Sequence, residues 1–198
     1  MKKLFVLLAL CVVSMNVVAQ NKPMKEFVDE LLSKMTLKEK LGQLNLLPAG
    51  NITTGAVQNN PIVQQIKDGE LGGVFNIKGL NDIRTLQEMA IKKSRLGIPL
   101  LVGMDVIHGY ETIFPIPLAL ACSWNLKGIE NSARVAALEA SAEGVNWTYS
   151  PMVDICRDAR WGRIVEGAGE DPYLGSLVAK AMVKGYQGDY SLTSNIMA

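Results

Sequence analysis

The sequence has few of the side chains that bind metals or form cross-links. It contains three cysteines and one histidine among 198 residues. Outside the first twenty residues the cysteines are Cys122 and Cys156, and neither has a Cys-x-x-Cys or histidine partner at the spacing of a zinc site. We therefore expect no metal site, no cofactor and two unpaired thiols, although an exported protein is able to join such cysteines in a disulfide.

An excess of charge of either sign is also absent. The 20 Lys and Arg residues are balanced by 19 Asp and Glu residues, which leaves a formal net charge of +1. No concentrated basic face is present of the kind that releases counterions from nucleic acid, so we expect no nucleic-acid partner. Hydrophobic residues make up 48% and charged residues 20% of the chain, which is typical of a folded globular domain.

Hydrophobic runs long enough to cross a membrane are missing as well. The most prominent of the shorter hydrophobic runs lies near the N-terminus. Two lysines precede an apolar run over residues 4–13, and a small-residue cleavage pattern ends at Ala19. This order is typical of a signal peptide over residues 1–19, whereas a membrane anchor needs about 20 consecutive apolar residues. We expect the signal to be cleaved, the mature chain to be secreted without a membrane anchor, and the periplasm to be its destination.

Helical periodicity alternates with short apolar runs along the rest of the chain. Amphipathic or capped segments predict helices over residues 24–32, 36–44, 61–68, 80–96, 126–144 and 173–186. Continuous apolar runs predict strands over residues 71–77, 98–105 and 146–155. Residues 48–61 are expected to form a loop, and residues 113–120, which contain two prolines, an extended connection.

Strands that alternate with helices favour a parallel sheet, either doubly wound or closed into a (β/α) barrel. The barrel is preferred because Asp105 and Asp154 follow predicted strands, and barrel active sites lie at the C-terminal ends of the strands. Only about three strand-helix units are recognisable, whereas a full barrel has eight. Residues 195–198 end on apolar side chains without a cap, so we expect an interrupted strand there. The predicted fold is α/β, the N-terminal part of a (β/α)8 TIM-like barrel that is incomplete in this chain.

The segment over residues 154–171 holds the densest group of charged and aromatic side chains. Three arginines and several carboxylates accompany Trp161. An aromatic face with hydrogen-bonding groups suits a sugar, whose ring has apolar C–H faces and hydroxyl edges. The same residues also suit a structural network of ion pairs that holds a long loop, and composition alone leaves both interpretations open.

Four groups of motifs in this chain occur together in one order. They are Met35-Thr36-Leu37-Lys38-Glu39-Lys40-Leu41-Gly42-Gln43, then Gly97-Ile98-Pro99-Leu100 with Gly103-Met104-Asp105, then Thr112-Ile113-Phe114-Pro115, and finally Arg157-Asp158-Ala159-Arg160-Trp161-Gly162-Arg163 with Gly169-Glu170-Asp171-Pro172. Over residues 25–198 the chain thereby resembles glycoside hydrolase family 3, in its β-glucosidase and β-xylosidase branch. The resemblance implies that residues 20–198 form part of the family's N-terminal (β/α) barrel domain.

The resemblance also implies two substrate-binding residues. Asp105 is expected to bind hydroxyl groups of the terminal sugar in the −1 subsite, and Arg163 to reach the same sugar ring. His108, the only histidine, is expected to orient the strand end and not to transfer protons. The other charged residues of the long loop are expected to brace it: Arg157, Asp158, Glu166, Glu170 and Asp171.

The family's reaction retains the configuration of the sugar, which requires a nucleophile and an acid/base whose carboxyl groups lie about 5 to 5.5 Å apart. No Asp or Glu of this chain matches the family's motif for either role, so we expect no catalytic residue in it. The whole protein is expected to hydrolyse terminal non-reducing β-D-glucosyl, or β-xylosyl, residues of β-linked oligosaccharides or glucosides. This chain alone is expected to be inactive.

Two other hypotheses remain open at this point. The first, from a different class, is a complete and non-catalytic sugar-binding module that uses Asp105, Arg163 and Trp161. The second is the β-N-acetylglucosaminidase branch of the same family, which the sequence Arg160-Trp161-Gly162-Arg163 makes less favourable.

Overall fold

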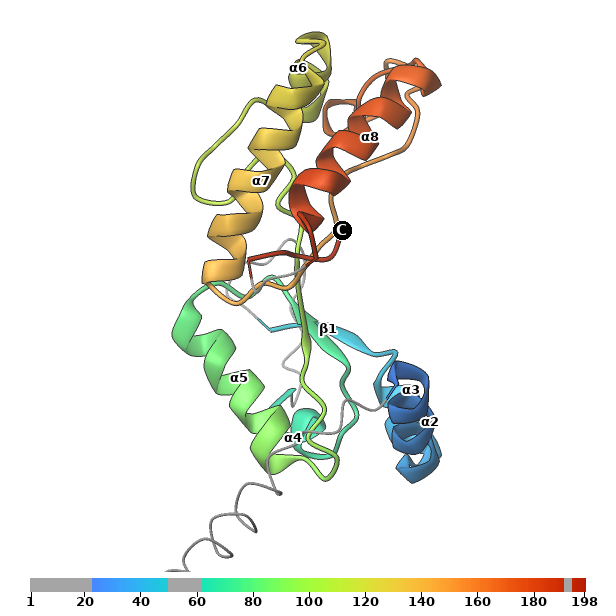
Figure 1. Cartoon of the computed structure of the whole chain (residues 1–198), viewed down its shortest axis with the longest axis vertical. Helices are drawn as coiled ribbons and strands as arrows, with labels where there is room; N and C mark the ends of the chain where they lie inside the picture. The colour runs from blue at the N-terminus through green and yellow to red at the C-terminus, as the bar shows by residue number, and fades with distance from the viewer. Residues whose placement is uncertain (1–22, 50–61, 191–193) are drawn as a thin grey trace, which may run out of the picture. The chain divides into compact units, whose positions relative to one another are not determined.

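The computed structural model describes three stretches of the chain, which are residues 23–49, 62–190 and 194–198 (Figure 1). The predicted signal peptide and the greater part of the loop predicted over residues 48–61 lie outside the described residues. Among the described residues, no helix combines the length and the hydrophobicity that crossing a membrane requires.

The chain divides into a first unit over residues 1–36 and a second unit over residues 37–198. In the first unit, the helix predicted over residues 24–32 is confirmed as α2, Met24–Lys34. Two exposed ion pairs at i,i+4 spacing support this helix. They join Lys25 to Asp29 and Lys34 to Glu30.

The second unit is built on a four-stranded parallel sheet in the order β1-β2-β3-β4. The strands are β1 Leu46–Pro48, β2 Gly73–Phe75, β3 Leu101–Met104 and β4 Trp147–Thr148. Leu47 pairs with Val74, which pairs in turn with Val102. Neighbouring strands are consecutive in the chain and are joined through helices, so the sheet has the topology of a barrel wall.

The last described segment adds to this sheet. Met197 forms a parallel bridge with Trp147. The Thr148 N–H donates to the Met197 carbonyl at 2.8 Å, and the Met197 N–H donates to the Asn146 carbonyl at 3.0 Å. The strand expected at residues 195–198 therefore begins beside β4, on the edge that β3 does not occupy.

Helices form the connections of the second unit. They are α3 Leu37–Gly42, α4 Ile62–Lys67, α5 Leu80–Lys93, α6 Pro117–Cys122, α7 Leu126–Ala142 and α8 Pro172–Gln187, with a 3-10 turn η1 at Ile164–Glu166. All of these except α6 and η1 confirm helices predicted from periodicity. The side chains of Asn125 and Asp171 cap α7 and α8 by accepting backbone N–H groups of the first turn.

Three elements differ from the expectation. Strand β1 was not predicted at all, and the structure therefore has four strands where about three units were expected. The connection expected to be extended over residues 113–120 contains the start of α6, because Pro117 stands in the first turn, where a helix does not need its missing N–H. The strand predicted over residues 146–155 is limited to β4, since Pro151 cannot donate to a strand ladder.

The core lies where the helices cover the sheet. Val74 and Val102, at the centre of the sheet, are fully buried. Helices α7 and α8 lie side by side (Figure 1), and Gly185 allows their close approach, since a Cβ at this position would lie 2.7 Å from the Cβ of Ala133. Four alanines form most of the buried face of α7, and larger side chains of α8 are buried in the same core: Ala133, Ala136, Ala137 and Ala140 on α7, Val178, Met182 and Tyr186 on α8.

Candidate functional site

Asp105 lies immediately after β3, at the C-terminal end of the sheet, and its side chain is exposed. The backbone carbonyl of Asp105 accepts two hydrogen bonds from the segment of β4. The Thr148 hydroxyl donates at 2.9 Å and the Ser150 hydroxyl at 2.6 Å. The neighbouring strand thus fixes the backbone of Asp105 and leaves its carboxylate free to contact a ligand.

Val106 turns the chain away from the strand. Its φ is +45°, in the left-handed region that β-branched residues rarely adopt and that costs on the order of 1–3 kcal/mol. The carbonyl of Val106 accepts a hydrogen bond from the Tyr186 hydroxyl of α8 at 2.7 Å. Burial raises the pKa of Tyr186 to about 12, so this hydroxyl stays protonated and able to donate.

Arg163 stands at the start of η1, in the loop after β4, and its side chain is also exposed. Its guanidinium forms a two-pronged ion pair with Glu166, with nitrogen–oxygen distances of 3.0 and 2.7 Å. Glu166 raises the pKa of Arg163, and the negative charges of Asp154 and Asp105 add to this effect. Asp105 and Arg163 thus follow the C-terminal ends of two paired parallel strands, β3 and β4.

The loop over residues 154–171 contains the ion pairs and caps that the bracing hypothesis requires. Asp158 pairs with Arg160, and this contact lowers the pKa of the Asp158 carboxyl. Glu166 pairs with Arg163 and Asp171 caps α8, whereas Arg157 and Glu170 are exposed. Asp158, Glu166 and Asp171 thus make contacts of the kind that a bracing role requires, and the role itself stays a prediction. Trp161 is partly buried, and its backbone N–H closes a turn onto the Asp158 carbonyl.

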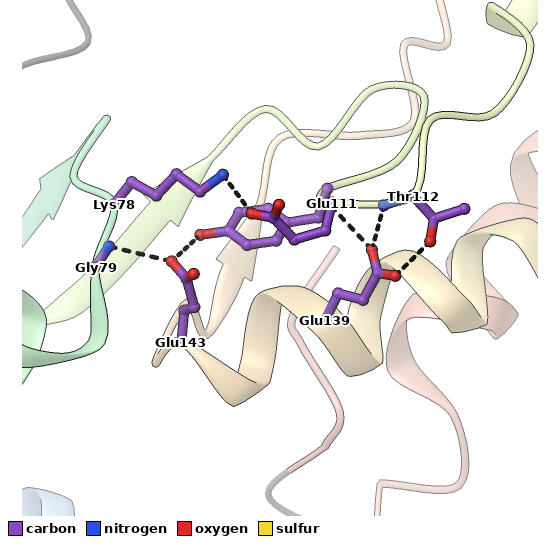
Figure 2. A network of polar contacts seen from close by, with 7 residues as sticks. Lys78, Gly79, Glu111, Thr112, Glu139 and Glu143 are labelled. Atoms are coloured by element: carbon purple, nitrogen blue, oxygen red, sulfur yellow. Dashed lines mark hydrogen bonds and ion pairs between the residues drawn. The ribbon is translucent and has the colours of Figure 1, made fainter.

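The loop that follows Asp105 is held in place by Glu139 of α7 (Figure 2). The carboxylate of Glu139 accepts the backbone N–H groups of Glu111 and Thr112 at 2.9 and 2.8 Å. It also accepts the Thr112 hydroxyl at 2.6 Å. These bonds, first of all those from Thr112, lower the pKa of Glu139. Within the same loop the Phe114 N–H donates to the carbonyl of His108 at 2.8 Å, so the loop is closed close to Asp105.

Glu143, one turn further along the chain, joins this loop to the one after β2 (Figure 2). Its carboxylate accepts the Tyr110 hydroxyl at 2.7 Å and the Gly79 N–H at 3.1 Å. Lys78 pairs with Glu111 and lies 5.0 Å from the centre of the Tyr110 ring. The Tyr110 hydroxyl lowers the pKa of Glu143, while burial and the contact with Glu143 raise the pKa of Tyr110. Sequence analysis missed this network, although the spacing of Glu139 and Glu143 places both on one face of the predicted helix.

The side chains of Val74 and Val102 point to one face of the sheet, and aromatic side chains near Asp105 lie on the other face. The rings of Trp147 and Tyr149 meet edge to face, with centroids 4.9 Å apart. The Tyr149 hydroxyl lies over Gly103 and has no hydrogen-bond partner among the residues that the structure describes. Burial, and secondly the charge of Asp105, raise the pKa of Tyr149 to about 12. Only a glycine leaves room for Tyr149 at position 103.

The side chains at this end of the sheet are suited to form hydrogen bonds with neutral, polar groups of a ligand. Asp105 offers a carboxylate acceptor and Arg163 a planar set of donors, which together suit the hydroxyl groups of a sugar. Within residues 23–49, 62–190 and 194–198, no three His, Cys, Asp or Glu side chains are grouped so as to hold a metal ion.

Comparison with known proteins gives one matching family model. It is the glycosyl hydrolase family 3 N-terminal domain, and it matches residues 36–197. The periplasmic β-glucosidase of Salmonella typhimurium is 48% identical over 165 residues, which are 82% of this chain and 21% of that protein. The lysosomal β-glucosidase of Dictyostelium discoideum is 30% identical over 190 residues, which are 82% of this chain and 23% of that protein.

Solved structures give the same result. The β-glucosidase from Listeria innocua in complex with glucose superposes with a TM-score of 0.77 at 43% identity, over 88% of this chain and 26% of that chain. A β-glucosidase involved in saponin metabolism from intestinal bacteria superposes with a TM-score of 0.69 at 38% identity, over 84% of this chain and 22% of that chain. This chain thus spans about a quarter of the length of the proteins that it matches.

Proposed function

Because this chain belongs to glycosyl hydrolase family 3, we propose that it is the N-terminal part of an enzyme that removes terminal, non-reducing β-D-glucosyl residues from oligosaccharides or β-glucosides. The similar proteins of Salmonella typhimurium and Listeria innocua are both named β-glucosidases. Two similar proteins of Formosa agariphila are named a putative β-xylosidase and a β-xylosidase, so β-xylosyl residues are the second substrate class.

The −1 subsite is the part of this activity that the chain supplies. In our proposal Asp105 accepts hydrogen bonds from hydroxyl groups of the terminal sugar, and Arg163 donates to the same ring. The observation that carries this assignment is that both side chains are exposed and follow the C-terminal ends of the paired parallel strands β3 and β4. The similar Listeria innocua structures contain glucose in one case and laminaribiose in another, which supports a glucosyl unit as the ligand.

Bond cleavage then depends on groups outside this chain. A retaining mechanism needs one carboxylate as nucleophile and a second carboxyl group as acid and base. We assign neither role to a residue of this chain, and we propose that the chain alone does not hydrolyse glycosides. Asp105 and Arg163 contribute by holding the sugar in the orientation that exposes its anomeric carbon.

Export is the second element of the proposal. We propose that residues 1–19 are a signal peptide, that residues 20–198 belong to the family's barrel domain, and that the mature protein acts in the periplasm. The n-region, apolar run and small-residue site of the first residues support the signal. The similar protein of Salmonella typhimurium is named a periplasmic enzyme, which supports the destination.

The test replaces the matching N-terminal part of the Listeria innocua enzyme with residues 36–197 of this chain and measures hydrolysis of 4-nitrophenyl β-D-glucoside. We expect the chimera to be active and the isolated 198-residue chain to show no turnover. In the chimera, Asp105→Asn should lower kcat/KM by about 10- to 100-fold, because a charged acceptor is lost. Asp82→Asn, which changes an exposed carboxylate on α5, is the matched control.

Three results would contradict the proposal, and each of them would contradict a different statement in it. Turnover by the isolated chain would show that its own residues include the catalytic groups. Unchanged kinetics of the Asp105→Asn chimera would remove this residue from the subsite. A chimera that unfolds cooperatively and binds glucose without hydrolysing the glucoside would favour the non-catalytic sugar-binding module.

A further inference from the structure

The turn at Asp105 and Val106 is a conformation that its own residues do not favour. Asp105 follows the last residue of β3, and Val106 adopts a left-handed conformation although it is β-branched. In the part of the chain that the structure describes, neither side chain forms a local hydrogen bond that would compensate for this conformation. The direction of the Asp105 carboxylate is therefore set by whatever holds the turn.

Three hydroxyl groups from other parts of the chain converge on this turn. Thr148 and Ser150 donate to the carbonyl of Asp105, and Tyr186 donates to the carbonyl of Val106. All three donor residues are at most 2% exposed, which strengthens their hydrogen bonds relative to bonds made in water. The Ser150 N–H also donates to the Thr148 hydroxyl at 3.1 Å, which orders the two donors relative to each other.

We propose that Tyr186, Ser150 and Thr148 are positioning residues that act on substrate binding through Asp105. Their hydroxyl groups fix the two carbonyls of the turn and thereby aim the Asp105 carboxylate toward the sugar. Tyr186 is the most informative of the three, because it stands 80 residues from Val106 and its ring fills the core between α7 and α8. This inference rests on the proposed role of Asp105 in the −1 subsite.

The experiment is a double-mutant cycle in the full-length protein that contains this chain, with 4-nitrophenyl β-D-glucoside as substrate. Tyr186→Phe removes the hydroxyl and leaves the ring in the core, and Asp105→Asn removes the charge that the turn aims. We expect Tyr186→Phe to lower kcat/KM by about 2- to 10-fold in the wild-type background, the effect of one neutral hydrogen bond. In the Asp105→Asn background the same change should have no further effect, because residues that act through one another are not additive.

Tyr190→Phe is the matched control. Tyr190 is 77% exposed, and its hydroxyl donates to Gln187 and not to the turn. We expect its kinetics to equal those of the wild type. A second pair serves if Tyr186→Phe does not fold: Ser150→Ala removes a donor to Asp105, whereas Ser176→Ala removes an exposed hydroxyl that donates within α8.

Hydrogen exchange measured by mass spectrometry gives a readout that needs no sugar. Peptides that cover residues 105–108 should exchange several-fold faster in Tyr186→Phe than in the wild type or in Tyr190→Phe. Unchanged exchange in this turn overturns the inference, and so do equal losses of kcat/KM in both backgrounds of the cycle, because these indicate a general loss of structure. Wild-type activity of Asp105→Asn alone overturns the proposed subsite instead, while a normal loss there with no loss in Tyr186→Phe overturns only the positioning role.

Discussion

The carboxylate of Glu139 holds Thr112 by two atoms, accepting its hydroxyl at 2.6 Å and its backbone N–H at 2.8 Å (Figure 2). Glu139 belongs to α7, and Thr112 belongs to the loop that leads away from Asp105. A single side chain therefore ties the loop after β3 to the helix that precedes β4.

We expect Glu139→Gln to loosen the loop without unfolding the protein. The amide keeps one acceptor oxygen but loses the charge that strengthens all three hydrogen bonds. Hydrogen exchange of the backbone amides of Glu111 and Thr112 should become about 5- to 20-fold faster, as for the loss of one charge-assisted bond. Glu88→Gln, which changes an exposed carboxylate on α5 that pairs with Lys92, should leave this loop unchanged. Equal exchange in both variants would show that Glu139 does not hold the loop.

The same contact should respond to acid. Hydrogen bonding lowers the pKa of Glu139 and, through Tyr110, that of Glu143. A carboxyl group whose folded pKa is lowered stabilises the fold fully above its ordinary value of about 4.3 and loses this contribution as the pH falls through the lowered pKa. The amide resonance of Thr112 should therefore stay constant from pH 7 to pH 5 and shift below the ordinary range. A midpoint at or above the ordinary value would contradict the lowered pKa, and Glu139→Gln should abolish the shift.

The sequence predicts most of the helices, for a reason that is visible in particular elements. Helix α7 is long and amphipathic, so its pattern located it almost residue by residue. Strand β1 has three residues and no period to detect, and α6 begins with prolines that suggest an extended chain. Asp105 and Arg163 are predicted as substrate-binding residues because each belongs to a short motif of consecutive residues. Their partners, such as Tyr186, lie far along the chain, and no local pattern indicates which distant side chain meets a given turn.

An ion pair between a buried carboxylate and a half-exposed guanidinium links α3 to the segment before β3. Glu39 is 6% exposed, and its two carboxylate oxygens accept Nε and Nη2 of Arg95 at 2.9 and 2.5 Å. Arg95→Ala should lower the urea concentration at the midpoint of unfolding, because the Glu39 carboxylate is left buried with fewer donors. The loss of stability should be smaller than for a fully buried ion pair, because Arg95 itself is half exposed.

Urea unfolding of the dilute chain, followed by tryptophan fluorescence, measures this change. Lys92→Ala is the control, since Lys92 and Glu88 form an exposed pair on α5 that contributes no more than about 1 kcal/mol. A loss for Arg95→Ala that does not exceed the control would show that this ion pair is not a stabilising contact.

Gly103 is expected to tolerate no side chain, because its missing Cβ makes room for Tyr149. Gly103→Ala should lower the free energy of unfolding by about 1–3 kcal/mol, the usual cost of forcing extra atoms into a packed site. Gly162→Ala is the control, since a Cβ there has no neighbour within 4 Å. Combining Gly103→Ala with Tyr149→Leu should recover part of the loss, and equal urea midpoints for Gly103→Ala and the control would contradict the overlap.

The sheet face that carries Tyr149 should make the isolated chain associate. A Cβ on Gly73 would lie 2.9 Å from a methyl group of Leu46 and 3.2 Å from the Cβ of Leu101, so both leucines share this face. Leu101 is 41% exposed, and an uncovered apolar face beside an open sheet edge favours self-association. Light scattering should detect oligomers at micromolar concentration, and Leu101→Gln should raise the concentration at which they form. Leu138→Gln on α7, 48% exposed, should not, and a wild-type chain that stays monomeric and melts cooperatively would refute the prediction.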